Sequence, residues 1–260
     1  ALSAMGTRFE LVVGDELAAG GGAARDADRL ALAEAALETV ARLDARLSRF
    51  RRDGVPAALA RAGVAGVRVT RDEIVLFELC RRAHARSGGA FDPAITSALA
   101  RLGLRDEPAG ADATFASIAI ERRARRVTAP AGLAPLAFGA VAKGYALDLA
   151  AREFVRGGVR VALLHGGTSS VVALGAPPGR TAWCVALRDP AETPTEAGAD
   201  PVRPLARVAL KDAALSVSAP HGRTRVITGR RVGHVVDPRD GTPVERVRLV
   251  AVVARHAATA

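Results

Sequence analysis

Residues 137–148 read Ala-Phe-Gly-Ala-Val-Ala-Lys-Gly-Tyr-Ala-Leu-Asp and lie near the middle of a chain of 260 residues. They include the only Tyr, Tyr145, and one of only two lysines, Lys143, in a chain that carries its other positive side chains as Arg. Glycine has no Cβ, so Gly139 and Gly144 would let the backbone approach a ligand closely. A helix that starts here would point free N–H groups and its positive dipole end at an anion. The stretch predicts either a phosphate-binding loop or an ordinary helix start with a solvated lysine.

Helical patterns precede this stretch and strand patterns follow it. Apolar residues at helical spacing predict a helix over Ala27–Leu47. The capping-box pattern Thr70-Arg71-Asp72-Glu73 predicts a second helix that continues to about Arg86. The central stretch itself should start a helix to about Val155. Further expected elements are a short helix ending near Leu102, a hairpin of 118–120 with 126–128, and strands over 7–13, 160–165, 169–174, 182–188, 206–210, 224–228, 233–236 and 248–253.

This order of elements predicts an α+β fold with mixed, largely antiparallel sheets flanked by helices. The chain is long enough for one large domain or two small ones. Residues 103–114 are polar and irregular, which is typical of a boundary. We therefore expect one domain over residues 1–260, built from two closely packed subdomains. The first, about 1–110, should be rich in helices, and the second, about 111–260, rich in strands.

The composition is that of an ordinary soluble globular protein, with 49% hydrophobic and 25% charged residues. No run of about 18 apolar residues is present, so no membrane span is expected. The first residues, Ala1-Leu2-Ser3-Ala4, have neither a basic nor an apolar signal region, and the chain has no lipobox Cys. These residues predict no export signal in this chain and leave the compartment open. Cys80 and Cys184 lack metal or redox spacing and are expected to be buried thiols.

The formal net charge of +10 favours an anionic partner. A nucleic acid is one alternative, with a salt-sensitive binding that a gel shift would detect. The chain has no Asn and no Gln, the usual readers of adenine, and only 3% aromatic residues for base stacking. Its arginines are spread along the sequence apart from short runs. The composition therefore favours a nucleotide over a nucleic acid.

Two further stretches carry histidines that chemistry could use. His165-Gly166-Gly167 follows an apolar segment, where paired glycines allow a tight turn or a close ligand approach. The segment Gly233–Pro243 contains His234 three residues before Asp237. On a continuous strand these two side chains would face opposite sides, so they share a site only if the chain turns near Pro238. His is the natural general base near neutral pH, and a polar hairpin corner is the alternative reading.

Taken together and in this order, several stretches resemble the ApbE family, the FAD:protein FMN transferases. The resemblance extends from residue 5 to residue 243, which is nearly the whole chain. The matching pieces are Met5-Gly6-Thr7, Leu47-Ser48-Arg49-Phe50, Gly89-Ala90-Phe91-Asp92-Pro93, Gly139-Ala140-Val141-Ala142-Lys143-Gly144-Tyr145-Ala146, Gly166-Gly167, and His234-Val235-Val236-Asp237-Pro238-Arg239 with Gly241 and Pro243.

The resemblance implies a T-fold-like α+β catalytic unit that binds FAD with Mg²⁺. It implies transfer of FMN to a Thr or Ser hydroxyl of an acceptor flavoprotein, within a motif like Ser/Thr-Gly-Ala-Thr/Ser, with AMP leaving. Some members of the family hydrolyse FAD instead, and a degenerate FAD-binding protein without transferase activity is a further alternative. Attack on a diphosphate needs charge neutralisation and positioning more than covalent help, which agrees with an arginine-rich chain.

The resemblance also implies roles for individual residues. His234 would be the base that takes the proton from the acceptor hydroxyl, and the main-chain oxygen of Ala140 would be a metal ligand. The remaining residues would bind the cofactor: Lys143 would reach it, Ala90, Phe91 and Asp92 would line its site, Met5 and Phe50 would pack near the flavin or adenine, and Val236 would lie beside it.

The chain departs from the family pattern at several positions. Ala137 stands where the family usually has an acid, Thr168 where it has Asn, and Asp240 where it has Thr. The usual Thr-Ser-Gly run appears as Val217-Ser218-Ala219. The family continues with an Asp and a Thr that bind the metal, and the C-terminal end of the family domain is expected to be missing after Ala260. From this we expect weak Mg²⁺ binding and poor or no transfer by the chain as given.

Overall fold

The computed structural model describes residues 1–14, 23–106, 109–189, 204–219, 224–227 and 229–260. The chain forms two compact units, each built from separated segments. The first unit comprises Ala1–Leu43, Val141–Ala219 and Val247–Ala260, and the second comprises Asp44–Ala140 and Pro220–Arg246. Residue 110, near which a subdomain boundary was expected, lies inside the second unit.

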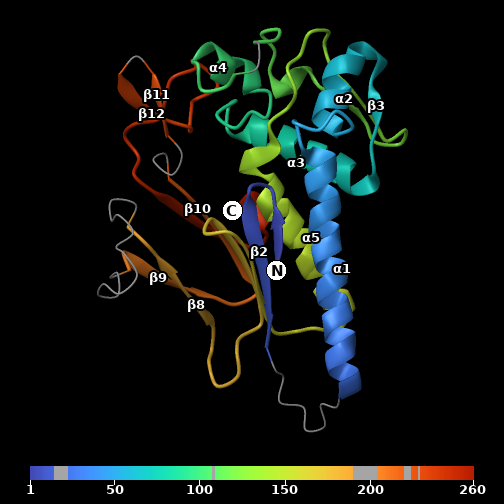
Figure 1. The fold of residues 1–260 in the computed structure, drawn as a ribbon, viewed down its shortest axis with the longest axis vertical. Helices are drawn as coiled ribbons and strands as arrows, with labels where there is room; N and C mark the ends of the chain where they lie inside the picture. Colours follow the sequence, from blue (N-terminus) through green and yellow to red (C-terminus); the bar gives the residue numbers. More distant parts are fainter. Residues whose placement is uncertain (15–22, 107–108, 190–203, 220–223, 228) are drawn as a thin grey trace. The chain divides into compact units, whose positions relative to one another are not determined.

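The first unit is built on a six-stranded sheet with the order β1-β2-β6-β7-β10-β13 (Figure 1). All of its neighbouring strands pair antiparallel. The turn between the first two strands consists of Met5 and Gly6, which both have positive φ, as a tight hairpin turn requires. The strands are β1 (Leu2–Ala4), β2 (Thr7–Val13), β6 (Ala162–Gly166), β7 (Ser170–Leu174), β10 (Ala213–Ser218) and β13 (Val250–Ala254).

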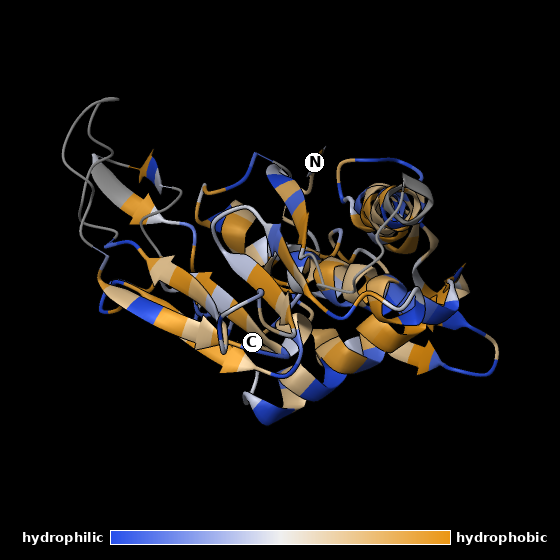
Figure 2. Ribbon diagram, turned by 90° about the horizontal axis from the view of Figure 1, so that it is seen from below, coloured by the Kyte–Doolittle hydropathy of each residue, from blue (hydrophilic) through white to orange (hydrophobic). Residues whose placement is uncertain are grey.

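Helix α5 (Ala142–Arg156) packs against β6 and β7 of this sheet. Ala162 and Leu164 of β6 are fully buried, because alternate residues of a strand point to the same face. The two-stranded sheet of β8 (Trp183–Leu187) and β9 (Ala206–Leu210) covers a second apolar cluster of this unit. Figure 2 shows that apolar residues make up most of these strands. The sheet therefore buries side chains on both faces.

The first turns of α5 bind the backbone of a short 3-10 helix, η5 (Ala257–Thr259). The Asp148 carboxylate accepts the N–H groups of Ala257 and Ala258 at 2.8 and 2.9 Å. A Cβ on Gly144 would lie 2.3 Å from the carbonyl oxygen of Ala257. The close backbone approach expected at Gly144 is thus made to this chain's own backbone. A Cβ on Gly139, in contrast, would have no neighbour within 4 Å.

The second unit combines short helices with two small sheets. Its three-stranded sheet has the order β3-β5-β4, and β11 pairs antiparallel with β12. Its core includes Phe77, whose ring lies 6.0 Å from that of Phe115 and 5.4 Å from that of Phe138. The elements are α2 (Val55–Ala62), β3 (Val67–Arg68), α3 (Arg71–Arg86), α4 (Thr96–Arg101), β4 (Ala119–Glu121), β5 (Arg126–Thr128), β11 (Thr224–Ile227), β12 (Arg230–Gly233) and the 3-10 helices η1 (Gly63–Ala65), η2 (Phe115–Ser117) and η3 (Phe138–Ala140).

Helix α3 begins at the capping box that the sequence predicted. The Thr70 hydroxyl accepts the Glu73 N–H at 3.2 Å, and the Glu73 carboxylate accepts the Thr70 N–H at 2.7 Å. The Glu73 side chain is buried, and Arg46 of α1 (Ala23–Leu47) donates to it through two nitrogens at 2.7 and 3.1 Å. This bond to Glu73 is the main cause of the raised pKa of Arg46. The bidentate pair compensates the buried charge at the start of the helix.

The expected α+β class with antiparallel sheets is confirmed, and some elements differ. Helix α2 and strand β10 were not expected, and the strand expected over Gly233–Val236 is β12, which ends at Gly233. Of the two cysteines, Cys80 is buried, which raises its pKa to about 12, whereas Cys184 is exposed and not the buried thiol expected. The Pro-rich segment 189–204, which the sequence predicts to be a surface loop, lies mostly outside the described residues. None of the described helices has the length and apolar character that a membrane crossing needs.

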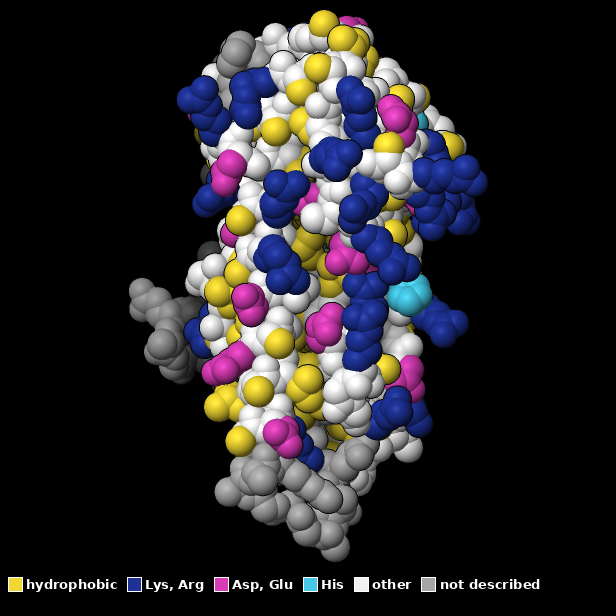
Figure 3. All heavy atoms as spheres, turned by 90° about the vertical axis from the view of Figure 1, so that its right-hand side faces the viewer, with side chains coloured by type: hydrophobic (Ala, Val, Ile, Leu, Met, Phe, Trp, Pro, Cys, Tyr) yellow, Lys and Arg dark blue, Asp and Glu magenta, His cyan; other side chains and the backbone are white. Residues whose placement is uncertain are grey.

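Nearly all of the excess positive charge belongs to the second unit. Its segments contain 22 Arg and 13 Asp and Glu, whereas the first unit contains 15 Lys and Arg and 14 Asp and Glu. On the face that Figure 3 shows, Lys and Arg side chains are interspersed with Asp and Glu. The charge asymmetry between the units points to the second unit as the part that meets anions.

Candidate functional site

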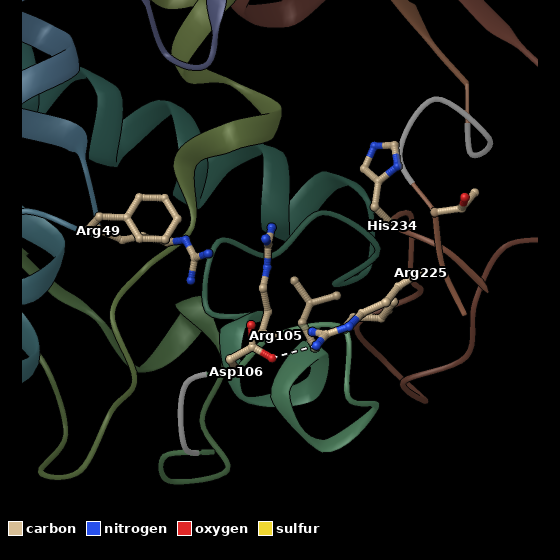
Figure 4. A pocket seen from close by; sticks show the side chains of 9 residues that line it. Arg49, Arg105, Asp106, Arg225 and His234 are labelled. Carbon is tan, nitrogen blue, oxygen red and sulfur yellow. Dashed lines mark hydrogen bonds and ion pairs between the residues drawn. The ribbon is translucent and has the colours of Figure 1, made fainter. Parts of the chain in front are cut away.

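The second unit contains a cavity of about 590 Å³ (Figure 4). It brings together side chains from segments far apart in the sequence: the end of α1, the loop after α4, and the β11–β12 hairpin. Two residues expected in the site, Phe50 and His234, both line it. The lining residues are Arg49, Phe50, Leu99, Leu104, Arg105, Asp106, Thr224, Arg225 and His234.

Three guanidinium groups, those of Arg49, Arg105 and Arg225, give the cavity a positive lining. Arg225 of β11 donates to the Asp106 carboxylate at 2.7 Å, which is drawn as a dashed line in Figure 4. The three arginines exceed the single acidic lining residue by two positive charges. Arg presents a planar fork of donors that matches phosphate oxygens. The cavity is therefore suited to an anion with several oxygens.

An aromatic surface lies at the wall of the same cavity. Phe50 is 77% exposed, and the guanidinium carbon of Arg49 lies 4.2 Å from its ring centroid. An exposed aromatic side chain at a cavity wall offers a ligand a flat apolar surface. A flat ring system bound against Phe50 would bury its exposed face, and the stacked Arg49 adds a cation–π contact.

His234 lies directly after β12 and at the edge of the cavity. His234 is exposed, so its imidazole is accessible to solvent and to a bound group. Val236, two residues further, is buried and forms an isolated antiparallel bridge with Pro243. The chain then turns, since the Gly241 N–H donates to the Asp237 carbonyl at 2.8 Å. The turn expected near Pro238 is present.

The carboxylate at this turn is bound to an arginine. Arg239 donates to the two Asp237 oxygens, through Nε at 2.9 Å and through Nη2, and its backbone N–H adds a bond at 3.0 Å. These bonds lower the pKa of Asp237 to about 2, and the largest cause is the bond from the Arg239 side chain. Arg239 also lies beside the loop of residues 88–93, which we call the glycine-rich loop, because its Cγ would be 3.6 Å from a Cβ on Gly89. The turn and this loop are therefore neighbours.

We expect the Arg239→Ala variant to raise the pKa of Asp237 from about 2 toward the ordinary 3.8, because the main cause of the lowering is removed. A lowered pKa stabilises the fold above pH 3.8, and that contribution is lost as the pH falls through about 2. Carboxyl-carbon NMR titration would measure the change. Asp240 serves as the internal control: its lowered pKa is caused mainly by its bonds to Thr242, with a smaller contribution from Arg239, so its pKa should rise less than that of Asp237.

The glycine-rich loop is held by polar side chains of the loop itself and of α3. The buried Asp92 carboxylate accepts the N–H of Ala94 at 2.7 Å and that of Phe115 at 3.1 Å. Nδ1 of His84 lies 3.1 Å from the Phe91 carbonyl oxygen and 3.4 Å from the Asp92 carboxylate. These contacts assign Asp92 to shaping the loop, while Ala90 is exposed and Phe91 half-buried. Contact of Ala90, Phe91 and Asp92 with a cofactor stays a prediction.

The other expected site residues are divided between the units. Ala140, the expected main-chain metal ligand, is exposed at the end of η3 in the second unit. Met5 and Lys143 belong to the first unit, in the β1–β2 turn and the first turn of α5. Val236 is buried beneath the turn after His234. The roles expected of these four residues remain predictions.

The charged lining of the cavity has no recognisable signal in the sequence. Arg105, Asp106 and Arg225 lie in segments without a motif, and the chain has so many arginines that these three carry no signal of their own. Arg49 lay within a matching piece, yet only Phe50 was selected from it. Among the described residues, no group of three or more His, Cys, Asp and Glu side chains could hold a metal ion.

The family model for the ApbE family matches residues 5–260. An FAD:protein FMN transferase of Rhodobacter capsulatus is 34% identical over 197 residues, which are 70% of this chain and 35% of that protein. The chain thus spans about a third of the length of this curated relative.

Solved structures show the same fold at lower identity. The ApbE protein of Thermotoga maritima matches with a TM-score of 0.80 and 23% identity, over 99% of this chain and 81% of that one. The flavin transferase ApbE of Vibrio cholerae matches with a TM-score of 0.76 and 16% identity, with the same coverage. The apo form of the Pseudomonas stutzeri flavinyl transferase ApbE gives 0.73 and 21%, over 97% of this chain and 81% of that one.

Proposed function

The chain belongs to the ApbE family, and from this we propose that it transfers FMN from FAD to a Ser or Thr hydroxyl of an acceptor protein. The observation that carries the proposal is the cavity that joins an exposed aromatic ring, three guanidinium groups and His234. FAD combines two flat ring systems with a diphosphate, so it offers each part of this lining a matching surface. The name of the Rhodobacter capsulatus relative, FAD:protein FMN transferase, supports the transfer of FMN from FAD to a protein.

The lining residues fit FAD by their chemistry. The exposed ring of Phe50, with Arg49 stacked on it, would bind one of the ring systems. Arg105 and Arg225 would bind diphosphate oxygens, and Asp106 would hold the guanidinium of Arg225 in place. Charge neutralisation of this kind is the main requirement for attack on a phosphoryl group.

In the proposed reaction, the acceptor hydroxyl oxygen attacks the phosphorus of the FMN half of FAD. The new phosphate ester bond forms as the P–O bond to the AMP half breaks, and AMP leaves with the bridging oxygen. His234 takes the proton that the hydroxyl loses, which general-base catalysis by an accessible imidazole allows. The cavity arginines stabilise the negative charge that develops on the phosphate oxygens.

The proposal includes a requirement for Mg²⁺, because the family resemblance implies this metal. The resemblance also implies that the main-chain oxygen of Ala140 is one of its ligands. Mg²⁺ prefers a near-octahedral set of oxygen ligands, several of them carboxylate, phosphate or water. The described residues do not provide a matching group of acidic side chains. The proposed transfer therefore uses only protein side chains, and addition of EDTA to the transfer assay tests the requirement for Mg²⁺.

The direct test is incubation with FAD, Mg²⁺ and a peptide that carries a Ser-Gly-Ala-Thr motif. We expect a covalently fluorescent peptide and one AMP for each FMN transferred. AMP release that does not depend on the peptide would show FAD hydrolysis instead. Tight FAD binding with neither product would show an FAD-binding protein without transferase activity, and absence of FAD binding would contradict the proposal.

The Arg105→Ala variant should bind FAD at least about tenfold more weakly, because a charge-assisted bond to the diphosphate is lost. Arg101→Ala is the matched control, since Arg101 lies four residues earlier, is exposed and pairs with Asp112 at 3.0 Å outside the cavity lining. Titration of flavin fluorescence measures both affinities. Equal affinities of the two variants for FAD would remove Arg105 from the site.

A further inference from the structure

A surface hairpin of the second unit concentrates exposed positive charge. β4 and β5 are joined by Arg122-Arg123-Ala124-Arg125, and Arg126 is the first residue of β5. Every residue from 121 to 126 is exposed. The turn is closed by the Arg125 N–H, which donates to the Arg122 carbonyl at 3.3 Å. Arg68 of the neighbouring β3 completes a group of five arginines, which we call the arginine patch.

The patch places like charges opposite each other in a sheet. Arg68 and Arg126 are direct register partners of the antiparallel pair β3–β5. Val127, the next residue of β5, is fully buried, so Arg126 points to the outer face. Like charges directly opposite across two strands destabilise the sheet. Stability of the sheet alone does not account for Arg at both positions.

The turn of the hairpin carries a second local cost. Arg125 has a φ of +48°, the left-handed conformation that Gly adopts without steric penalty. An Arg here destabilises the turn relative to Gly. Positions where several local rules fail together are commonly functional. In the arginine patch both exceptions concern the same residue type, which indicates that the charge itself is used.

The charge of the patch is only partly compensated. Arg122 lies 3.7 Å from the Glu78 carboxylate, and Glu121 is the cross-strand partner of Arg126. The Arg126 guanidinium donates to the carbonyl oxygen of Ala65, which carries no net charge. The five arginines thus exceed these two carboxylates by three positive charges. Val64, next to Ala65, is 77% exposed and adds an apolar contact point.

We propose that the arginine patch docks an acidic segment of the acceptor protein. This inference rests on the proposed function, because transfer of FMN to a protein requires that protein to be held. Arg binds carboxylates through two parallel bonds, and the second unit carries the excess charge that would attract such a segment. A membrane surface is less favoured, because Val64 gives the patch little to insert into lipid. Nucleic acid is less favoured by the scarcity of aromatic residues and the absence of Asn and Gln.

The test compares two peptides with the same Ser-Gly-Ala-Thr motif, one followed by a run of Asp and Glu and the other by a run of Gly and Ser. We expect the acidic peptide to bind more tightly by fluorescence anisotropy and to have a lower KM, with an advantage that high salt removes. The combined variant Arg122→Glu, Arg123→Glu, Arg125→Glu should lose at least about tenfold of the affinity for the acidic peptide. Its affinity for FAD should not change.

Two controls separate the patch from general charge and from folding. The combined variant Arg160→Glu, Arg180→Glu, Arg207→Glu changes the net charge equally at exposed sites of the first unit and should keep the affinity for the acidic peptide. Arg125→Gly should raise the Tm, because Gly adopts the left-handed conformation without steric strain. The same variant should bind the acidic peptide more weakly. A structural role alone would not give these opposite effects.

The outcomes distinguish the two proposals. Transfer to the Gly/Ser peptide tests the proposed function alone, and its absence would contradict that function without affecting the binding measurement. An equal loss of affinity for the acidic peptide in both charge variants, or no loss in either, would overturn the docking role of the arginine patch. The wild type could instead bind a DNA duplex or phosphatidylserine vesicles more tightly than the acidic peptide and lose that binding only in the patch variant. This result would overturn the proposal that the partner is an acidic protein segment.

Discussion

The His234→Ala variant is expected to lose transfer of FMN by roughly 100- to 10,000-fold, the range that removal of a general base produces. The residue is exposed and follows the end of β12, so the fold should not change. The affinity for FAD should remain within about threefold, because the imidazole is assigned to the proton and not to the diphosphate. Covalent fluorescence of the acceptor peptide measures the transfer, and flavin titration measures the affinity.

The matched control for this variant is His256→Ala. His256 is also exposed, but it lies in the first unit, after β13. Its variant should transfer FMN at the rate of the wild type. Full transfer by His234→Ala would remove His234 as the base, whereas a loss of FAD affinity large enough to explain the slower transfer would assign it to binding.

The Gly144→Ala variant should be destabilised by at least about 2 kcal/mol, as is usual when a methyl group is forced into a filled space. Its Cβ would lie 2.3, 2.5 and 2.9 Å from backbone atoms of Ala257 and Ala258, and backbone cannot move aside as a flexible side chain can. For a chain of this size the loss corresponds to a fall in Tm of roughly 4–8 °C. Differential scanning calorimetry would detect it.

Gly139→Ala provides the control within the same stretch. A Cβ at Gly139 would meet nothing within 4 Å, and its φ is not positive. The stability of this variant should stay within about 1 kcal/mol of the wild type, since Ala mainly restricts the unfolded chain. A similar fall in Tm for both variants would mean that the helix start, and not the contact with Ala257, determines the effect.

Elements that are determined by residues close together in the sequence were predicted well. The capping box at Thr70 and Glu73 is formed by bonds between residues three apart, so the sequence alone located the start of α3. Strand β2 was predicted with its observed bounds because its apolar residues Phe9, Leu11 and Val13 alternate with other residues along the chain. Short-range periodicity carries this kind of information.

Elements that depend on distant partners were predicted less well. β12 contains Arg230 and Arg231 and has no apolar run, and it becomes a strand by pairing with β11. The segment Gly233–Val236 has the stronger strand pattern, so the sequence predicts the strand a few residues after its observed position. β10 likewise gains its place between β7 and β13 from pairing that no local pattern shows.

The same distinction holds for the site. Phe50 and His234 were selected because they belong to matching stretches, and the structure places both at one cavity. Arg225 and Asp106 meet across 119 positions of sequence, so only the fold shows that they form a pair. Partners of Gly144 and Asp148 at Ala257 and Ala258 are more than a hundred residues away and were equally invisible.

The interleaved segments of the two units have a consequence for synthesis on the ribosome. β2 ends at Val13 and pairs with β6, which begins at Ala162, and β13 completes the same sheet only at Val250–Ala254. At usual translation speeds of about 5–20 residues per second, β2 waits on the order of 10 s for its partner. During that interval the backbone donors and acceptors on the β6 side of β2 are open to other strands, while β1 pairs with its other side. Nascent-chain aggregation should therefore depend on translation rate, and a slower ribosome would lengthen the vulnerable period.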